Sequence, residues 1–385
     1  MKQIELLLQN KGVSKSVIFP CTESEYQAAC RELELKDHYA FVRDVVEPKA
    51  LAFKKDTFVN LDEINYLAKR MDSFDQKELF SFFAAVEAGD YISTKDLINL
   101  SFNLNCYTLI RDVSNLKSVG RNYVLCREVA ISADELEKMD LEKIGRELLS
   151  TGKGIPTNYG LLFRNEDVAF ETLYKGKGFP PYYYTGGEVL GVEIEKDGKK
   201  DYIYFPCEKT EIERALQRIG ASNISESSKR IDFCGGDEEW EKYFNDLLQK
   251  NDLDSVNAIS SAINRLGANL DAISENLYKL SAVMEFAGVT TADTEKVIRL
   301  AGCLEEFEYY REIGNDYNLG TKLIENEIGS AAEKIDDYIN YEKYAQDFLE
   351  ENGGAYTKYG DVVYLREDQT LSEILGENDI EIGGI

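Results

Sequence analysis

Carboxylates dominate the chemistry available to this sequence, in which 71 aspartates and glutamates stand against 44 lysines and arginines. Residues 1–200 carry 32 acidic and 27 basic side chains, whereas residues 201–385 carry 39 acidic and 17 basic ones. Ten carboxylates of the second half are grouped within a few positions of one another: Asp237, Glu238, Glu239, Glu305, Glu306, Glu308, Glu325, Glu327, Asp336 and Asp337. A dense negative surface attracts a basic partner and disfavours direct binding of nucleic acid, because neutralising phosphates needs a basic footprint. We therefore expect these ten residues to form an acidic face for a protein partner with a basic groove.

Each of these groups, taken alone, is more typical of a solvated helix face than of a binding site. Their accumulation in one half is the feature that favours a partner, since a charge that only aids solubility does not explain an asymmetry between the halves. Carboxylates of such a face act collectively, so a single Asp or Glu change is expected to cost little.

The sequence offers little for catalysis. His38 is the only histidine, which excludes any mechanism or metal site that needs two, and its polar surroundings favour a solvated or locally hydrogen-bonded side chain. No GxxxxGK[ST], HExxH or EF-hand motif is present. Carboxylate pairs are too abundant to mark acid–base catalysis. We expect no catalytic residue, no cofactor and no metal site; an enzyme of unknown type would need a cleft with perturbed pKa values.

Seven cysteines without a CxxC pair argue against a disulfide framework and a zinc site, and Cys21 and Cys207 are expected to be buried thiols. No apolar run of about 18 residues predicts a transmembrane helix, and no secretory signal is evident at the N-terminus. These features predict a cytoplasmic protein.

The elements that would position the carboxylates begin with β-hairpins. Residues 4–20 predict a hairpin that turns at residues 10–13, and residues 189–205 predict another, with Asp197 and Gly198 in the positive-φ positions of its turn. Thr22 and Glu25 form a capping box for a helix after the first hairpin. Residues 61–103 predict short helices, and residues 105–165 predict a small unit of strands and helices.

The chain also repeats itself. Residues from Ile98 to Gly160 and their equivalents in the second copy keep an offset of 200, and upstream pairs keep an offset of 186. The second copy of residues 61–123 starts at Leu253, and the offset grows through insertions in that copy. Pairs in this register are Ile98 with Ile298, Leu100 with Leu300, Arg111 with Arg311, Asn115 with Asn315, Gly120 with Gly320, and Cys21 with Cys207. A shared register over many positions indicates a duplicated module. The predicted organisation is a near-neutral first module (residues 1–165), a linker (166–187), a strongly acidic second module (188–366) and an acidic tail (367–385).

Specific motifs of the repeat resemble a known family. Residues 61–123, with LDEINYLAKRMDSFD at the start, KDLINLSFNLNCY in the centre and VGRNY at the end, resemble the ArdA antirestriction proteins of conjugative elements and phages. Residues 338–347, YINYEKYAQD, are similar to the tyrosine-rich YIDYxxYGRD pattern of that family, with departures at Asn340, Ala345 and Gln346.

The resemblance implies an α+β chain of two tandem ArdA-like modules, each with a β-hairpin unit, a small helical unit and a C-terminal α+β unit, elongated overall. It implies a non-catalytic inhibitor that mimics B-form DNA and blocks the DNA-binding groove of type I restriction–modification or related host-defence enzymes. Members of the family usually dimerise, so a homodimer, or a tandem that stands in for one, is consistent with it. The alternative is a non-catalytic interaction module of a mobile element that binds its partner through apolar and tyrosine surfaces.

Overall fold

The chain combines helices with small antiparallel sheets, which confirms the predicted α+β class. The computed structural model describes residues 3–89, 91–127, 131–181, 187–329, 338–358, 360–366 and 370–377. Within these ranges the strands form one four-stranded and three three-stranded sheets, and the strand pairs in them whose register is defined are antiparallel. None of the described helices is long and apolar enough to cross a membrane.

The described residues form two compact units. Unit 1 comprises those of Met1–Tyr184, Lys196–Asp201 and Glu208–Gly220. Unit 2 comprises those of Thr185–Glu195, Tyr202–Cys207 and Ala221–Ile385. The units divide the chain differently from the predicted sequence modules, because helix α8 (Lys209–Ile219) follows the second hairpin in sequence but belongs to unit 1.

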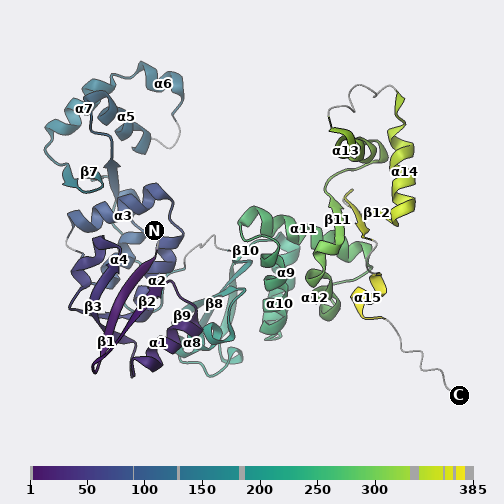
Figure 1. The fold of residues 1–385 in the computed structure, drawn as a ribbon, viewed down its shortest axis with the longest axis horizontal. Helices are drawn as coiled ribbons and strands as arrows, with labels where there is room; N and C mark the ends of the chain where they lie inside the picture. Colours follow the sequence, from purple (N-terminus) through teal and green to yellow (C-terminus); the bar gives the residue numbers. More distant parts are fainter. Residues whose placement is uncertain are drawn as a thin grey trace. The chain divides into compact units, whose positions relative to one another are not determined.

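Unit 1 begins with a four-stranded sheet in the order β2-β1-β3-β4 (Figure 1). Its strands are β1 (Ile4–Asn10), β2 (Val13–Phe19), β3 (Tyr39–Glu47) and β4 (Phe58–Asn60). The predicted hairpin is confirmed: Asn10 pairs with Val13, and Lys11 and Gly12 take positive φ in the turn. Helix α1 (Glu23–Glu32) follows, with Thr22 and Glu25 in the expected capping box.

The helical part of unit 1 and its second sheet complete the first repeat. The helices are α2 (Leu61–Asp72), α3 (Gln76–Ala88), α4 (Thr94–Ser101), α5 (Leu116–Arg127), α6 (Ala133–Lys138) and α7 (Leu141–Ser150), with short 3-10 turns η1 (Lys49–Lys54) and η2 (Leu104–Cys106). The second sheet has the order β5-β7-β6, from β5 (Tyr107–Ile110), β6 (Ile155–Thr157) and β7 (Gly160–Arg164). Buried Ile110, Val119 and Phe163 join this sheet to α5.

The described part of the predicted linker, residues 166–181, is a packed segment of unit 1. Tyr174 is 4% exposed, and its backbone N–H and C=O bond to the side chain of Asn99 at 2.8 and 2.9 Å. Phe179 stacks on Tyr66 with ring centroids 4.5 Å apart. Aromatic burial therefore fixes this segment to helices α2 and α4; residues 182–186 of the predicted linker lie outside the described residues.

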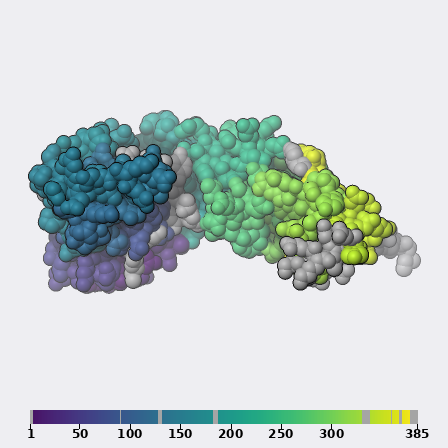
Figure 2. Space-filling model, turned by 90° about the horizontal axis from the view of Figure 1, so that it is seen from above, coloured from purple at the N-terminus to yellow at the C-terminus, as the bar shows by residue number. Residues whose placement is uncertain are grey.

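Unit 2 also has two sheets joined by helices, but within the described residues its first sheet lacks a fourth strand, and helix α9 follows that sheet. Its first sheet has the order β10-β8-β9, and its second sheet has the order β11-β13-β12. In the space-filling view, the teal and green residues from β10 to α12 pack without a visible gap (Figure 2). The strands are β8 (Leu190–Lys196), β9 (Lys199–Phe205), β10 (Ser228–Cys234), β11 (Phe307–Tyr310), β12 (Ala355–Tyr356) and β13 (Val362–Leu365). The helices are α9 (Glu238–Gln249), α10 (Leu253–Arg265), α11 (Leu270–Phe286), α12 (Thr294–Gly302), α13 (Asp316–Ile328), α14 (Tyr341–Asn352) and α15 (Leu371–Leu375), with 3-10 turns η3 (Ile224–Glu226) and η4 (Leu304–Glu306).

Equivalent residues of the two copies make equivalent contacts. The guanidinium of Arg111 lies 4.1 Å from the ring centroid of Phe80, and that of Arg311 lies 4.1 Å from the ring centroid of Tyr278. The Asn158 N–H donates to Glu87 (3.0 Å), and the Lys358 N–H donates to Glu285 (2.7 Å). Such long-range contacts need the same chain path, so the two halves share one local architecture.

The closest helix crossings also recur, at glycines. A Cβ atom on Gly120 would lie 1.9 Å from the carbonyl oxygen of Leu141, and a Cβ atom on Gly320 would lie 2.0 Å from that of Tyr341. Only glycine lets the paired helices, α5 with α7 and α13 with α14, approach this closely. This requirement explains a glycine inside each helix, where glycine otherwise lowers stability.

Part of the acidic tail is ordered. Thr370 and Glu373 form a capping box for α15, whose Ile374 and Leu375 are buried. Glu377 forms an ion pair with Lys296 of α12. Residues 378–385, where the sequence predicts a frayed end, lie outside the described residues.

Candidate acidic binding surface

The first acidic group lies at the start of α9 in unit 2. Asp237 caps the helix: its carboxylate accepts the backbone N–H groups of Glu239 and Trp240, both at 3.1 Å. Asp237, Glu238 and Glu239 are all exposed. Carboxylates are favourable at a helix N-terminus because the unpaired N–H groups there carry partial positive charge. The helix therefore gains stability from this group, and Glu238 and Glu239 still face solvent.

The second acidic group does not present free charge throughout. Glu308, on β11, forms an ion pair with Arg366, whose Nε donates at 2.8 Å. Glu305 lies 3.4 Å from Arg265. Between these two positions Glu306 is half-buried. Each of Glu305 and Glu308 is therefore matched by a cation from another segment, so their charge is partly offset, and their place in a partner-binding acidic face stays a prediction.

The third group lies near the end of α13. Glu325 and Glu327 are exposed, and Glu327 accepts a hydrogen bond from the Tyr344 hydroxyl at 2.8 Å. Asp336 and Asp337, the fourth group, lie outside the described residues. Among the predicted carboxylates that the structure describes, those without an ion pair to a cationic side chain are Asp237, Glu238, Glu239, Glu306, Glu325 and Glu327.

A cavity in unit 2 brings the first group together with carboxylates that the sequence did not single out. This unit 2 cavity has a volume of about 1020 Å³ and is lined by α9, by the end of α11 and by the turn after β12. Its acidic lining residues are Asp237, Glu238, Glu239, Glu285, Glu312 and Asp361, and its basic lining residues are Arg311 and Lys358. Trp240, Tyr243, Tyr278 and Tyr309 supply aromatic walls. The predicted residues of β11 and α13 are not among its lining residues.

The additional carboxylates of the cavity carry no local sequence signal. Glu285 stands alone near the end of an apolar helix, and Asp361 follows a turn. The offset between the copies does not identify Glu285 either: Glu285 and Glu87 accept the equivalent N–H groups of Lys358 and Asn158, but they are 198 positions apart, whereas the two donors are 200 apart.

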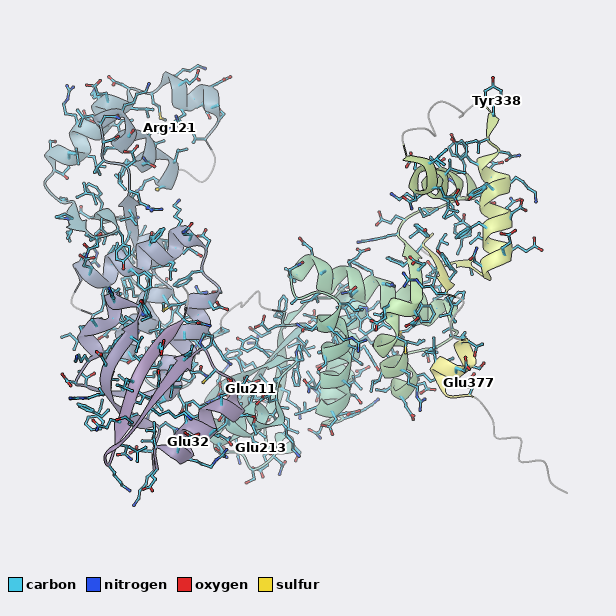
Figure 3. All side chains as sticks on the ribbon, viewed as in Figure 1. Glu32, Arg121, Glu211, Glu213, Tyr338 and Glu377 are labelled. Carbon is cyan, nitrogen blue, oxygen red and sulfur yellow. The ribbon has the colours of Figure 1, made fainter. Side chains whose placement is uncertain are left out.

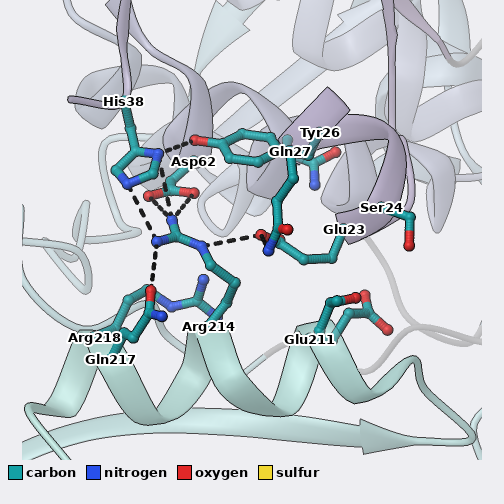
Figure 4. A network of polar contacts seen from close by, with 12 residues as sticks. Glu23, Ser24, Tyr26, Gln27, His38, Asp62, Glu211, Arg214, Gln217 and Arg218 are labelled. Atoms are coloured by element: carbon teal, nitrogen blue, oxygen red, sulfur yellow. Dashed lines mark hydrogen bonds and ion pairs between the residues drawn. The ribbon is translucent and has the colours of Figure 1, made fainter. Parts of the chain in front are cut away.

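A buried polar cluster in unit 1 is the most concentrated set of charges that sequence analysis missed. Arg214, on α8, lies 3.0 Å from Glu23 of α1 and 2.9 Å from Asp62 of α2 (Figure 4). The side chains of Arg214 and Glu23 are 8% exposed, and that of Asp62 is 16% exposed. Burial raises the pKa of Glu23 to about 7, against the opposing effect of Arg214. The cation thus holds three helices together.

His38 belongs to this cluster, so it is neither solvated nor confined to local partners. Its Nε2 lies 3.1 Å from Nη1 of Arg214, and its Nδ1 lies 2.7 Å from the Tyr26 hydroxyl. Arg214 also lies 3.5 Å from Nδ1, and since a guanidinium can only donate, a ring nitrogen of His38 accepts and the imidazole is neutral. Burial lowers the pKa of His38, which agrees with a neutral ring.

None of the seven cysteines forms a disulfide; Cys21 is buried as expected, whereas Cys207 is only half-buried. Burial raises the pKa of Cys21 to about 12, which favours a packing role for this thiol. Among the described residues no group of three or more His, Cys, Asp or Glu side chains is arranged to hold a metal ion.

Comparison with known proteins adds no relative: no protein-family model, no curated protein and no solved structure matches the chain.

Proposed function

We propose that this protein is a non-catalytic inhibitor that mimics DNA and occupies the DNA-binding groove of a type I restriction–modification enzyme or a related host-defence enzyme. The observation that carries the proposal is the concentration of negative charge, with 39 acidic against 17 basic side chains in residues 201–385. A polyanionic surface competes with nucleic acid for a basic groove because it displaces the same counterions.

The repeated architecture supports tandem ArdA-like modules. Each copy has a hairpin-based sheet, then short helices, then a three-stranded sheet with packed helices. This order agrees with the three units that the ArdA resemblance implies for each module.

The ion pairs described above refine the acidic face. Affinity comes collectively from carboxylates without a basic neighbour, above all the exposed group at the start of α9 and Glu325 of α13. Glu305 and Glu308 contribute less, because Arg265 and Arg366 already offset their charge.

Competition tests the proposal directly. A purified type I methyltransferase core is bound to the protein, and its cognate duplex is added at two salt concentrations. Mutual exclusion that weakens steeply with salt is expected, because counterion release governs affinity for a phosphate-binding groove. Simultaneous binding of the protein and DNA, or no binding to any such enzyme, refutes the proposal.

A second candidate function is an interaction module that docks a partner through apolar and tyrosine surfaces. Tyr338 is 88% exposed and points away from the ribbon (Figure 3), and Phe58 is 72% exposed. Binding through such residues would change little with ionic strength, whereas polyanion mimicry would weaken. The same competition measurement at two salt concentrations separates the two functions.

A further inference from the structure

We propose that the unit 2 cavity is a binding site for an arginine side chain of a basic segment in a protein partner. The inference rests on the proposed function for the identity of the partner, whereas the chemistry of the cavity stands on its own geometry. It assigns a specific receptor to a surface that would otherwise act only through its overall charge.

The first argument is charge complementarity inside a concave site. The cavity of about 1020 Å³ is lined by six carboxylates and two basic side chains. Arg311 is engaged by Glu275 at 2.9 Å and Glu312 at 3.4 Å. An excess of carboxylates therefore remains at the rim, chiefly Glu238 and Glu239, and a concave site focuses their field on an entering cation.

The second argument is the aromatic wall. A guanidinium stacks on aromatic faces as well as pairing with carboxylates, which distinguishes it from the ammonium of lysine. The cavity already contains this arrangement, because the guanidinium of Arg311 lies 4.1 Å from the centroid of the Tyr278 ring. Tyr309, which is half-buried, supplies further aromatic lining for a second guanidinium, whereas Trp240 and Tyr243 are only 4% and 5% exposed.

The first copy supplies an internal comparison. A crevice of about 510 Å³ lies at the equivalent place in unit 1, beside Glu87 and Asn158. There Lys49 lines the opposite wall, where unit 2 has Asp237, Glu238 and Glu239. The crevice and an aromatic lining belong to both copies, whereas the acidic group of Asp237, Glu238 and Glu239 is specific to the second copy because helix α9 begins there.

The test uses the single tryptophan of the chain as the reporter. Trp240 lines the cavity and is 4% exposed, so its emission responds to a ligand there. The full-length protein is titrated with an acetylated, amidated hexa-arginine peptide at low salt, and with hexa-lysine at equal charge. Saturable change of Trp240 emission is expected, with hexa-arginine binding several-fold more tightly than hexa-lysine.

Matched triple variants localise the site. Glu238→Gln, Glu239→Gln and Glu312→Gln together should weaken hexa-arginine binding about tenfold, because three rim charges are lost. The control, Glu241→Gln, Asp246→Asn and Asp254→Asn, removes the same charge from exposed helix positions that do not line the cavity, and should weaken binding less than about threefold. Thr290→Arg, which places a competing guanidinium at the exposed rim, should abolish the Trp240 response.

Equal losses in the two triple variants, or an unchanged Trp240 response in Thr290→Arg, would overturn the arginine site. The two proposals fail separately. Peptide binding without DNA competition refutes DNA mimicry and leaves the arginine site intact. If the protein does not bind the peptide, and Thr290→Arg competes with DNA as well as the parent protein does, the arginine site is refuted and DNA mimicry is left intact.

Discussion

Replacement of Arg214 by methionine tests whether the buried charge cluster holds α8 in unit 1. Methionine preserves most of the length and apolar surface of the arginine stem and removes only the cation. Glu23 and Asp62 would then face each other without the guanidinium that lies 3.0 and 2.9 Å from them. His38 would lose the donor at its Nε2.

The expected loss follows from burial. Removing one partner of a buried ion pair typically costs about 3–5 kcal/mol, because the remaining charge stays desolvated. Asp62 is 16% exposed and Glu23 can take up a proton, so we place the loss at the lower end, about 3 kcal/mol at pH 8. Arg146→Met is the matched control: its ion pair with Glu142 is 68% and 60% exposed, and exposed pairs contribute at most about 1 kcal/mol.

The loss should also depend on pH in a defined direction. Arg214 lowers the pKa of Glu23, so the pKa of Glu23 in Arg214→Met lies above the value of about 7 in the parent protein. The folded variant then retains a proton on Glu23 that the unfolded chain has released, so its stability falls with rising pH over a wider pH range than that of the parent protein. The difference between parent and variant is therefore larger at pH 8.5 than at pH 6.

The assay is urea unfolding of the full-length protein followed by far-UV circular dichroism at both pH values. Adding Glu23→Gln to Arg214→Met should recover part of the loss at pH 8.5, since it removes one uncompensated carboxylate. A loss below 1 kcal/mol at pH 8.5, or a loss equal to that of Arg146→Met, would show that water screens the cluster and that Arg214 does not hold α8.

Further predictions concern the helix crossings and the buried carboxyl. Gly120→Ala and Gly320→Ala should each lower the free energy of unfolding by about 1–3 kcal/mol, because the added Cβ would lie about 2 Å from a carbonyl oxygen. Gly302→Ala is the control: its added Cβ enters open space and should not lower the free energy of unfolding. Equal melting temperatures for the three variants would contradict this packing. Glu23→Gln should change the pH profile of stability. The folded pKa of Glu23, about 7, exceeds its ordinary value of 4.5, so the parent protein loses up to about 3 kcal/mol relative to the variant as pH rises from 4.5 to 7. A constant difference in urea midpoint between pH 5 and pH 8 would refute the burial of this carboxyl.

Local sequence chemistry predicted the local elements well. The turn at Lys11 and Gly12 and the capping box of Thr22 follow from interactions between residues a few positions apart, so their residue types are sufficient to recognise them. The cluster around Arg214 could not be predicted in this way, because Arg214 and Asp62 are 152 residues apart. The acidic groups show the same limit: sequence identified Glu305 and Glu308 as charged, but their pairing depends on cations from other segments.

The two copies show how a duplicated module changes its electrostatics without changing its contacts. Contacts that set the chain path, such as Arg111 on Phe80 and Arg311 on Tyr278, recur at the same distance. The charge difference lies instead on exposed positions and on helix α9, whose acidic first turn lines the unit 2 cavity. Exposed substitutions alter the free energy of folding little, whereas they change the surface potential additively. A module of this kind can therefore become polyanionic in one copy while the other stays near neutral, with 39 acidic against 17 basic side chains in residues 201–385 and 32 against 27 in residues 1–200.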